Sequence, residues 1–179
     1  MGMGALQTGL MTVVEFLELP EPKEGHIELH HGEVITMPPP KWGHTQIQAR
    51  LQTLLQKMLG DTFAVRVEMP FRPAPEHEVW VADVGCVSTE RDAETAADEY
   101  LQGAPELAIE VLSPSNTVDE INDKMIICMA NGCNSFWTVD QKRNIVSVTQ
   151  GAVTTHYDVQ ATIVIASPYM EVKVAEIFA

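Results

Sequence analysis

A charged residue inside an apolar strand is the feature that most constrains this chain. Residues 107–112 (LAIEVL) form a short run that predicts a buried strand covered on both faces. Because side chains alternate along a strand, Glu110 shares a face with Ala108 and Leu112. Burial of a lone carboxylate is costly. The fold must therefore place a compensating group beside Glu110.

The residues that follow predict a strand–helix–strand unit. Ser113-Pro114 ends the strand. Thr117 and Glu120, three residues apart, form the pattern of a capping box, which predicts a helix over residues 117–131. Residues 135–139 read as a second buried strand.

The rest of the chain predicts a frame around this unit. Strands and helices alternate in an order that predicts an α/β fold with a mixed central sheet, flanked by helices and carrying an N-terminal and a C-terminal β-hairpin. The length of 179 residues fits one domain, 1–179, with residues 1–10 expected to be disordered or foreign to the natural chain. The expected elements are a short helix at 12–19, hairpins at 27–37 and 144–157, a helix at 44–59, strands at 63–69 and 79–87 with a loop at 70–78, an acidic solvated segment at 89–102, and strand-like pieces at 162–166 and 171–174.

The composition limits the partners and the compartment. A net charge of −14 argues against loose, nonspecific binding to polyanions. Residues 1–75 carry a net charge of −2, so a polyanion would approach that half rather than residues 76–179. No apolar run is long enough for a membrane span, and no signal-peptide pattern occurs. Three cysteines without CxxC spacing predict structural, reduced thiols. We therefore expect a cytoplasmic protein with no membrane partner.

A second acid is expected beside Glu110. Asp83 lies in the middle of the predicted strand 79–87. If the two strands pair, the carboxylates converge, and either one stays protonated or a cation neutralises them. Oxygen ligands favour a hard ion, Mg²⁺ or Mn²⁺. Taken singly, either acid is better explained by a backbone hydrogen bond or an arginine partner, and only together with Lys124 do the two favour a functional site.

Lys124 is the expected positive member of this group. It lies at the edge of the apolar face of the predicted helix 117–131, and its long stem can follow the core while its ammonium group reaches the sheet. A lysine beside metal-bound carboxylates fits metal-assisted hydrolysis of a phosphodiester. The competing interpretation is an exposed lysine paired with Glu120. His44 points inward at a helix start, where a hydrogen-bonded residue and a catalytic one are both consistent with the pattern.

Several short stretches of this chain form a recognisable set. They are 28–33 (ELHHGE), 37–40 (MPPP) with His44, 82–84 (ADV), 103–107 (GAPEL), 110–115 (EVLSPS), 123–124 (DK) and 136–140 (FWTVD). Together they resemble the Uma-two family of restriction-endonuclease-like proteins, within the PD-(D/E)XK nuclease superfamily. The similarity covers roughly residues 12–157, and the stretch EVLSPS with its flanks is the most specific.

The resemblance implies a nuclease core with Asp83 and Glu110 as the motif acids. The superfamily lysine normally follows the second acid by two residues, where this chain has Leu112, so the resemblance assigns that role to Lys124. It also implies that Glu33 and His44 lie near the site and that the protein forms a homodimer. Cys128 departs from the family, which often has tyrosine there.

The leading hypothesis is an endonuclease that hydrolyses DNA with Mg²⁺ or Mn²⁺. Asp83, Glu110 and the carbonyl of Val111 would hold the metal, and Lys124 would assist the attacking water. A nuclease fold used only for binding or assembly is one alternative. A hydrolase of a small phosphodiester is another, and it suits the net charge of −14 better than duplex DNA does.

Overall fold

A seven-stranded mixed sheet forms the centre of the protein. The structure is a computed structural model that describes residues 9–97, 99–166 and 169–179; most of the segment expected to be disordered or foreign lies outside the described residues. The strand order is β5-β3-β4-β6-β7-β8-β9. These strands are β3 (Phe63–Arg72), β4 (Trp80–Ser88), β5 (Leu101–Gln102), β6 (Leu107–Val111), β7 (Ser135–Asp140), β8 (Ile145–Gln150) and β9 (Val153–Tyr157).

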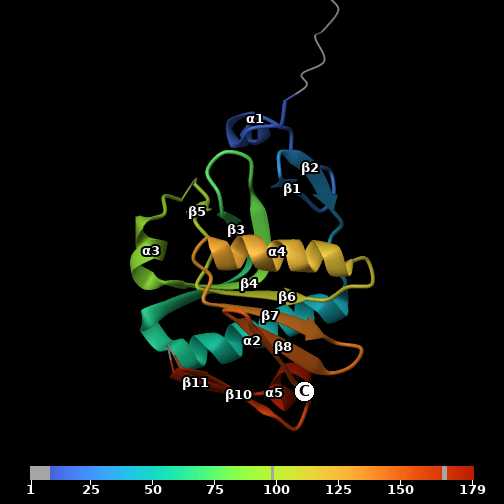
Figure 1. The fold of residues 1–179 in the computed structure, drawn as a ribbon, viewed down its shortest axis with the longest axis vertical. Helices are drawn as coiled ribbons and strands as arrows, with labels where there is room; N and C mark the ends of the chain where they lie inside the picture. Colours follow the sequence, from blue (N-terminus) through green and yellow to red (C-terminus); the bar gives the residue numbers. More distant parts are fainter. Residues whose placement is uncertain (1–8, 98, 167–168) are drawn as a thin grey trace, which may run out of the picture.

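Helices cover both faces of this sheet (Figure 1). One face packs against α2 (Trp42–Leu59), β10 (Thr162–Ala166), β11 (Tyr169–Lys173) and α5 (Val174–Phe178). The other face packs against α4 (Val118–Ala130). The β3–β5 and β6–β7 pairs are parallel and the remaining pairs are antiparallel. The predicted α/β fold with a mixed sheet is confirmed.

The N-terminal hairpin forms a separate small sheet beside β4. It consists of β1 (His26–His30) and β2 (Glu33–Met37), and the short helix α1 (Val13–Leu17) packs next to it (Figure 1). Two backbone hydrogen bonds between Leu29 and Val79, at 2.8 and 2.9 Å, join β1 to the residue before β4. This contact brings the polar side chains of β1 to the central sheet.

Two buried cores lie on the two faces of the sheet. Ile109 and Val111 of β6 belong to the core under α2, whereas Ala108 belongs to the core under α4. Alternation along β6 therefore turns Glu110 toward α4, as its position in the strand predicts.

Along β3 and β4, the buried side chains switch from one face of the sheet to the other. Val65 and Cys86 belong to the core under α2, but Met69 and Ala82 belong to the core under α4. Residues four apart in a regular strand share a face, so the pleat is interrupted between them. Glu68 and Asp83 lie at this interruption, unpaired in the register between Val67–Val84 and Met69–Ala82, and Glu68 has φ +48°.

β3 is longer than the sequence predicts. It continues through Pro70, where the sequence predicts a loop. Pro70 faces Val81, and β5 joins the open side of β3 only at Phe71 and Arg72. Proline is compatible with a strand whose outer edge is free for most of its length.

The C-terminal helix α5 is a second element that the sequence analysis did not predict.

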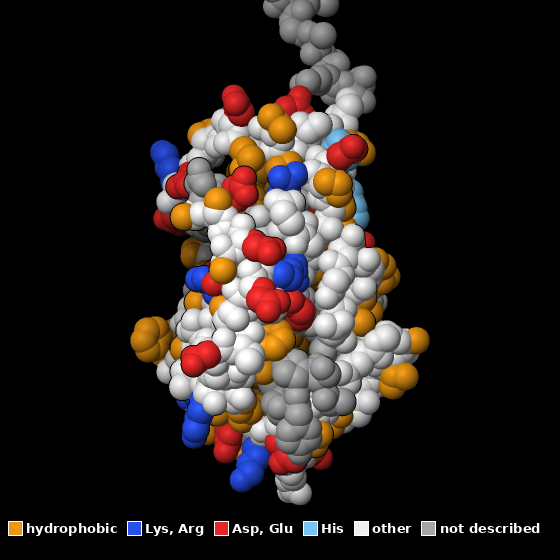
Figure 2. Space-filling view, turned by 90° about the vertical axis from the view of Figure 1, so that its left-hand side faces the viewer, with side chains coloured by type: hydrophobic (Ala, Val, Ile, Leu, Met, Phe, Trp, Pro, Cys, Tyr) orange, Lys and Arg blue, Asp and Glu red, His pale blue; other side chains and the backbone are white. Residues whose placement is uncertain are grey.

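Charged side chains are interspersed over the side of the molecule that carries α3 (Thr89–Glu94), which Figure 2 shows. Arg66 pairs with Asp92 at 2.7 Å, and Arg91 pairs with Glu106 at 2.8 Å. Residues 89–97 and 99–100 are exposed or half-buried, which agrees with the expected solvated segment, whereas Leu101 is buried in β5. Of the helices in the described ranges, none is long and apolar enough to cross a bilayer.

Candidate active site

Lys124 and Glu110 form a buried ion pair between α4 and the sheet. The Thr117–Glu120 capping box opens α4, as predicted. Lys124 and Glu110 are each 7% exposed, and Lys124 Nζ lies 2.8 Å from Glu110 Oε1. The same ammonium group donates a hydrogen bond to the carbonyl of Val81 at 2.5 Å. The interpretation of Lys124 as an exposed partner of Glu120 is therefore wrong. Lys124 instead neutralises the buried carboxylate of Glu110, which would be costly to bury alone.

The surroundings keep Lys124 protonated. Burial alone would lower its pKa, but Glu110, Glu28 and Asp83 together raise the pKa of Lys124 above its ordinary value. Burial raises the pKa of Glu110, with Lys124 opposing this shift and Asp83 adding to it, and the ion pair with Lys124 favours the ionised carboxylate. Lys124 is thus a fixed cation that can bind negative charge but cannot act as a base.

Asp83 lies where both hydrogen-bonded ladders of β4 break. The β4–β6 pairing stops at Val84 and Ile109, one residue short of Asp83 and Glu110. The free amide of Val111 instead donates to Asp83 Oδ2 at 2.7 Å. His44 Nε2, in the first turn of α2, lies 2.9 Å from Asp83 Oδ1. The structure thus joins His44 to Asp83, Asp83 to the residue after Glu110, and Glu110 to Lys124.

Glu68 adds a second carboxylate to Asp83. One ligand atom from each of His44, Glu68 and Asp83 lies within 4.8 Å of the others, and all three side chains are half-buried. Gln48 Nε2 donates to Glu68 and, at 3.2 Å, to Asp83 Oδ1. The left-handed backbone of Glu68 is a strained conformation for a residue with a side chain, and such strain gathers at functional sites.

This donor set fits a divalent cation. Carboxylate oxygens suit Mg²⁺ and Mn²⁺, and an imidazole nitrogen moves the preference toward Mn²⁺. The pKa of His44 reports the same surplus of negative charge. Burial lowers the pKa of His44, but the hydrogen bond to Asp83 and the charges of Asp83 and Glu68 outweigh burial and raise this pKa above its ordinary value.

Glu28 is a further buried carboxylate beside Lys124. It is 2% exposed, lies 3.1 Å from His26 Nε2 and 2.9 Å from His30 Nε2, and accepts a hydrogen bond from the amide of Val81 at 3.1 Å. Burial would raise the pKa of Glu28, but Lys124 and the two histidines outweigh it and hold the pKa well below its usual range. Glu28 is therefore ionised.

Two sequence-predicted site residues are arranged differently from this group. Glu33 is exposed at the start of β2 and is not a member of the His44–Glu68–Asp83 group. Val111 meets Asp83 through its N–H group. The roles assigned to Glu33 and to the Val111 carbonyl stay predictions.

Sequence reasoning missed Glu68, Gln48 and Glu28 as site residues. Gln48 had a signal, because it is a polar residue on the buried face of α2 between Ile47 and Leu51. Glu28 also had one, as an acid between two apolar residues of a strand. Glu68 had none, since its placement depends on the interrupted pairing of β3 with β4.

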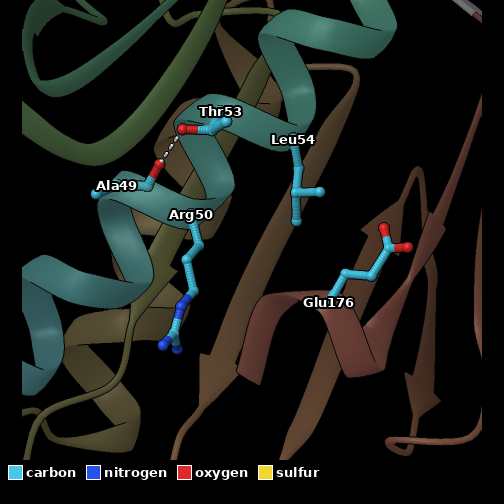
Figure 3. Close-up of a pocket in the computed structure, with 5 residues that line it drawn as sticks. All are labelled: Ala49, Arg50, Thr53, Leu54 and Glu176. Carbon is cyan, nitrogen blue, oxygen red and sulfur yellow. Dashed lines mark hydrogen bonds between the residues drawn. The ribbon is translucent and has the colours of Figure 1, made fainter. Parts of the chain in front are cut away.

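A hollow of about 340 Å³ lies elsewhere, between α2 and α5 (Figure 3). Its lining contains Arg50 and Glu176 as its charged residues and none of the His44–Glu68–Asp83 group. The chemistry therefore points to the break in the β4 ladders rather than to this hollow.

Comparison with known proteins identifies the family. The Uma2 family model, described as "Putative restriction endonuclease", matches residues 13–172. The chain belongs to the Uma2 family. Its fold is similar to that of a solved structure described as a putative nuclease belonging to DUF820 from Anabaena variabilis, with 21% sequence identity and a TM-score of 0.80 over 94% of this chain and 97% of that chain. No curated protein matches.

In this Uma2 chain the family departure at Cys128 leaves the lysine in place. Cys128 is fully buried four residues after Lys124, and burial raises the pKa of its thiol. Cys86 and Cys133 are also free and buried. All three cysteines are packing residues, as the sequence predicts.

Proposed function

We propose that this Uma2 protein is a metal-dependent endonuclease that hydrolyses phosphodiester bonds in DNA. The observation that carries this proposal is the half-buried His44–Glu68–Asp83 group beside the buried Lys124–Glu110 pair. One group has surplus negative charge for a cation, and the other holds a permanent positive charge for a phosphate.

Each residue has a distinct role in this proposal. His44, Glu68 and Asp83 would hold Mg²⁺ or Mn²⁺, with Glu110 and the Val111 carbonyl as the further ligands predicted from sequence. A bound ion of this kind polarises a phosphoryl oxygen and lowers the pKa of water. Lys124 would orient the attacking water and stabilise the negative charge that develops at phosphorus. Gln48 keeps the carboxylates of Glu68 and Asp83 in position through its amide.

The net charge of −14 supports a second candidate substrate, a small phosphodiester. A duplex carries its own dense negative charge, so an acidic surface slows its approach. A small diester meets less of this repulsion. A protein that binds or assembles without turnover is the remaining alternative, and the homodimer expected for the family is testable by light scattering.

The test is cleavage of plasmid and single-stranded DNA, and of bis(p-nitrophenyl) phosphate, with Mg²⁺, Mn²⁺ or EDTA. Wild type is compared with Asp83→Asn and with the matched control Asp61→Asn; Asp61 is exposed in the 3-10 helix η1 (Gly60–Thr62), which follows α2. We expect metal-dependent cleavage by wild type and Asp61→Asn and its loss in Asp83→Asn. Equal activity in Asp83→Asn would overturn the assignment, and activity on the small diester alone would favour the second substrate.

A further inference from the structure

The β1–β2 hairpin brings a histidine to the site that the proposed mechanism leaves unused. His26 begins β1, and its side chain is 33% exposed. Its Nε2 lies 3.1 Å from Oε1 of the buried Glu28, and no hydrogen bond of its Nδ1 occurs within the described residues. A histidine with one nitrogen fixed by a carboxylate and the other free is the arrangement of an acid–base catalyst.

Val81 of β4 connects the His26–Glu28 pair to Lys124, because its amide donates to Glu28 and its carbonyl accepts from Lys124. Besides Glu28, the electrostatic neighbours of His26 are Glu68 of the cation-binding group and Lys124 of the buried pair. The hydrogen bond to Glu28 raises the pKa of His26, burial opposes this, and the charges of Glu28 and Glu68 add to the rise against Lys124. The protonated form of the ring is therefore favoured on the side of β4 where Lys124 lies.

We propose that His26, oriented by Glu28, is the catalytic acid that protonates the leaving oxygen of the phosphodiester. This inference rests on the proposed nuclease function. The attacking water forms the new O–P bond and releases a proton to solvent. The bond from phosphorus to the leaving oxygen breaks, and that oxygen takes the proton from Nδ1 of His26. Solvent returns a proton to the ring as the products leave.

His30 contacts the same carboxylate but lacks this freedom. Its Nε2 lies 2.9 Å from Glu28 Oε2, yet its ring stacks flat on Trp80 with centroids 3.7 Å apart and planes 5° apart. The indole covers one face of the imidazole, and the ring acts in packing. His30 is thus a matched control: it is a second histidine on the same strand and the same glutamate.

The experiment removes the need for a proton donor. DNA cleavage is measured on an ordinary substrate and on the same DNA with sulfur in place of the bridging oxygen, in 3′-S and 5′-S versions, because a thiolate leaves without protonation. Wild type, His26→Asn and His30→Asn are compared with Mn²⁺. Thermal melting with and without Mn²⁺ accompanies each variant, to establish that it folds and still responds to the ion.

We expect His26→Asn to slow cleavage of ordinary DNA about 100-fold or more, the usual contribution of a general acid. With sulfur at the leaving position, the same variant is expected to approach the wild-type rate. His30→Asn is expected to affect both substrates alike and by less than about threefold. An equal loss on oxygen and sulfur substrates in a folded His26→Asn protein, or no loss on either, would overturn the inference alone. A wild type that cleaves neither substrate with Mn²⁺ would overturn both the inference and the proposed function.

Discussion

Two groups of charged side chains lie on neighbouring strands, one around Glu110 of β6 and one around Asp83 of β4, and their charges are balanced differently. Around Lys124, the charges compensate one another: Glu110 and Glu28 face a protonated ammonium group, and Glu28 has its own hydrogen-bond partners. Around Asp83, two half-buried carboxylates share one histidine and one amide side chain. In the first group the charges balance within the folded chain, whereas the second group keeps a surplus of negative charge. The second group is therefore the one expected to respond most to a cation.

The largest expected effect comes from breaking the compensated group. Lys124→Met leaves Glu110 and Glu28 buried without their cation, and we expect a loss of about 3–5 kcal/mol in the free energy of unfolding. Urea denaturation measures it. The double variant Lys124→Met/Glu110→Leu is expected to regain part of the loss, and Lys142→Ala in an exposed turn is the control. If Lys124→Met were as stable as wild type, the Lys124–Glu110 ion pair would not be needed to compensate the buried charge.

The second effect tests whether the uncompensated group takes a cation. Mn²⁺ at 100 times its dissociation constant is expected to stabilise wild type by about 2.7 kcal/mol, because the ion binds only the folded site. Because binding needs the unprotonated His44, whose pKa is raised, the affinity should increase as the pH rises through that pKa. Thermal melts across pH measure both. An equal Mn²⁺ response in Asp83→Asn would place the ion elsewhere.

A third prediction separates strain from ligation within the same group. Glu68→Gly removes a ligand but relieves a left-handed backbone, so the metal-free protein is expected to gain about 1 kcal/mol while Mn²⁺ affinity falls at least tenfold. Glu68→Ala removes the same ligand and keeps the strain, and serves as the control. If glycine and alanine variants are equally stable, the conformation of Glu68 stores no energy.

The smallest effect concerns the exposed ion pair between His31 of the β1–β2 hairpin and Asp123 of α4. His31 Nε2 lies 2.7 Å from Asp123 Oδ2, a contact that raises the pKa of His31 while burial opposes it and Glu78 assists. A raised folded-state pKa gives stability that is full below the ordinary value of 6.5 and is lost as the pH rises through the raised pKa.

Because His31 is 56% exposed, we expect His31→Gln to cost less than about 1 kcal/mol at pH 5.5, and almost nothing at alkaline pH or in high salt. Denaturant melts at two pH values measure this difference. If the stability lost in His31→Gln increased with pH, the ion pair would not depend on a charged His31.

The same contrast explains what the sequence could predict. Glu110 and Lys124 were predictable because each breaks a local pattern: one is a charge in an apolar strand, the other a lysine at the edge of an apolar helix face. His44 followed from its place at a helix start. Glu68 was not predictable, because its role depends on how β3 meets β4, and local periodicity does not encode that pairing. The docking of the hairpin through Leu29 and Val79, which delivers Glu28 and His26, is nonlocal in the same way.

The central claim is that His44, Glu68 and Asp83 hold the cation while Glu110 keeps its ion pair with Lys124. Crystals grown with Mn²⁺ and measured at the manganese absorption edge test it directly. The account predicts an anomalous peak in contact with these three side chains, with Lys124 still bound to Glu110. A peak that displaces Lys124 from Glu110, or no peak near Asp83 at saturating Mn²⁺, would contradict it.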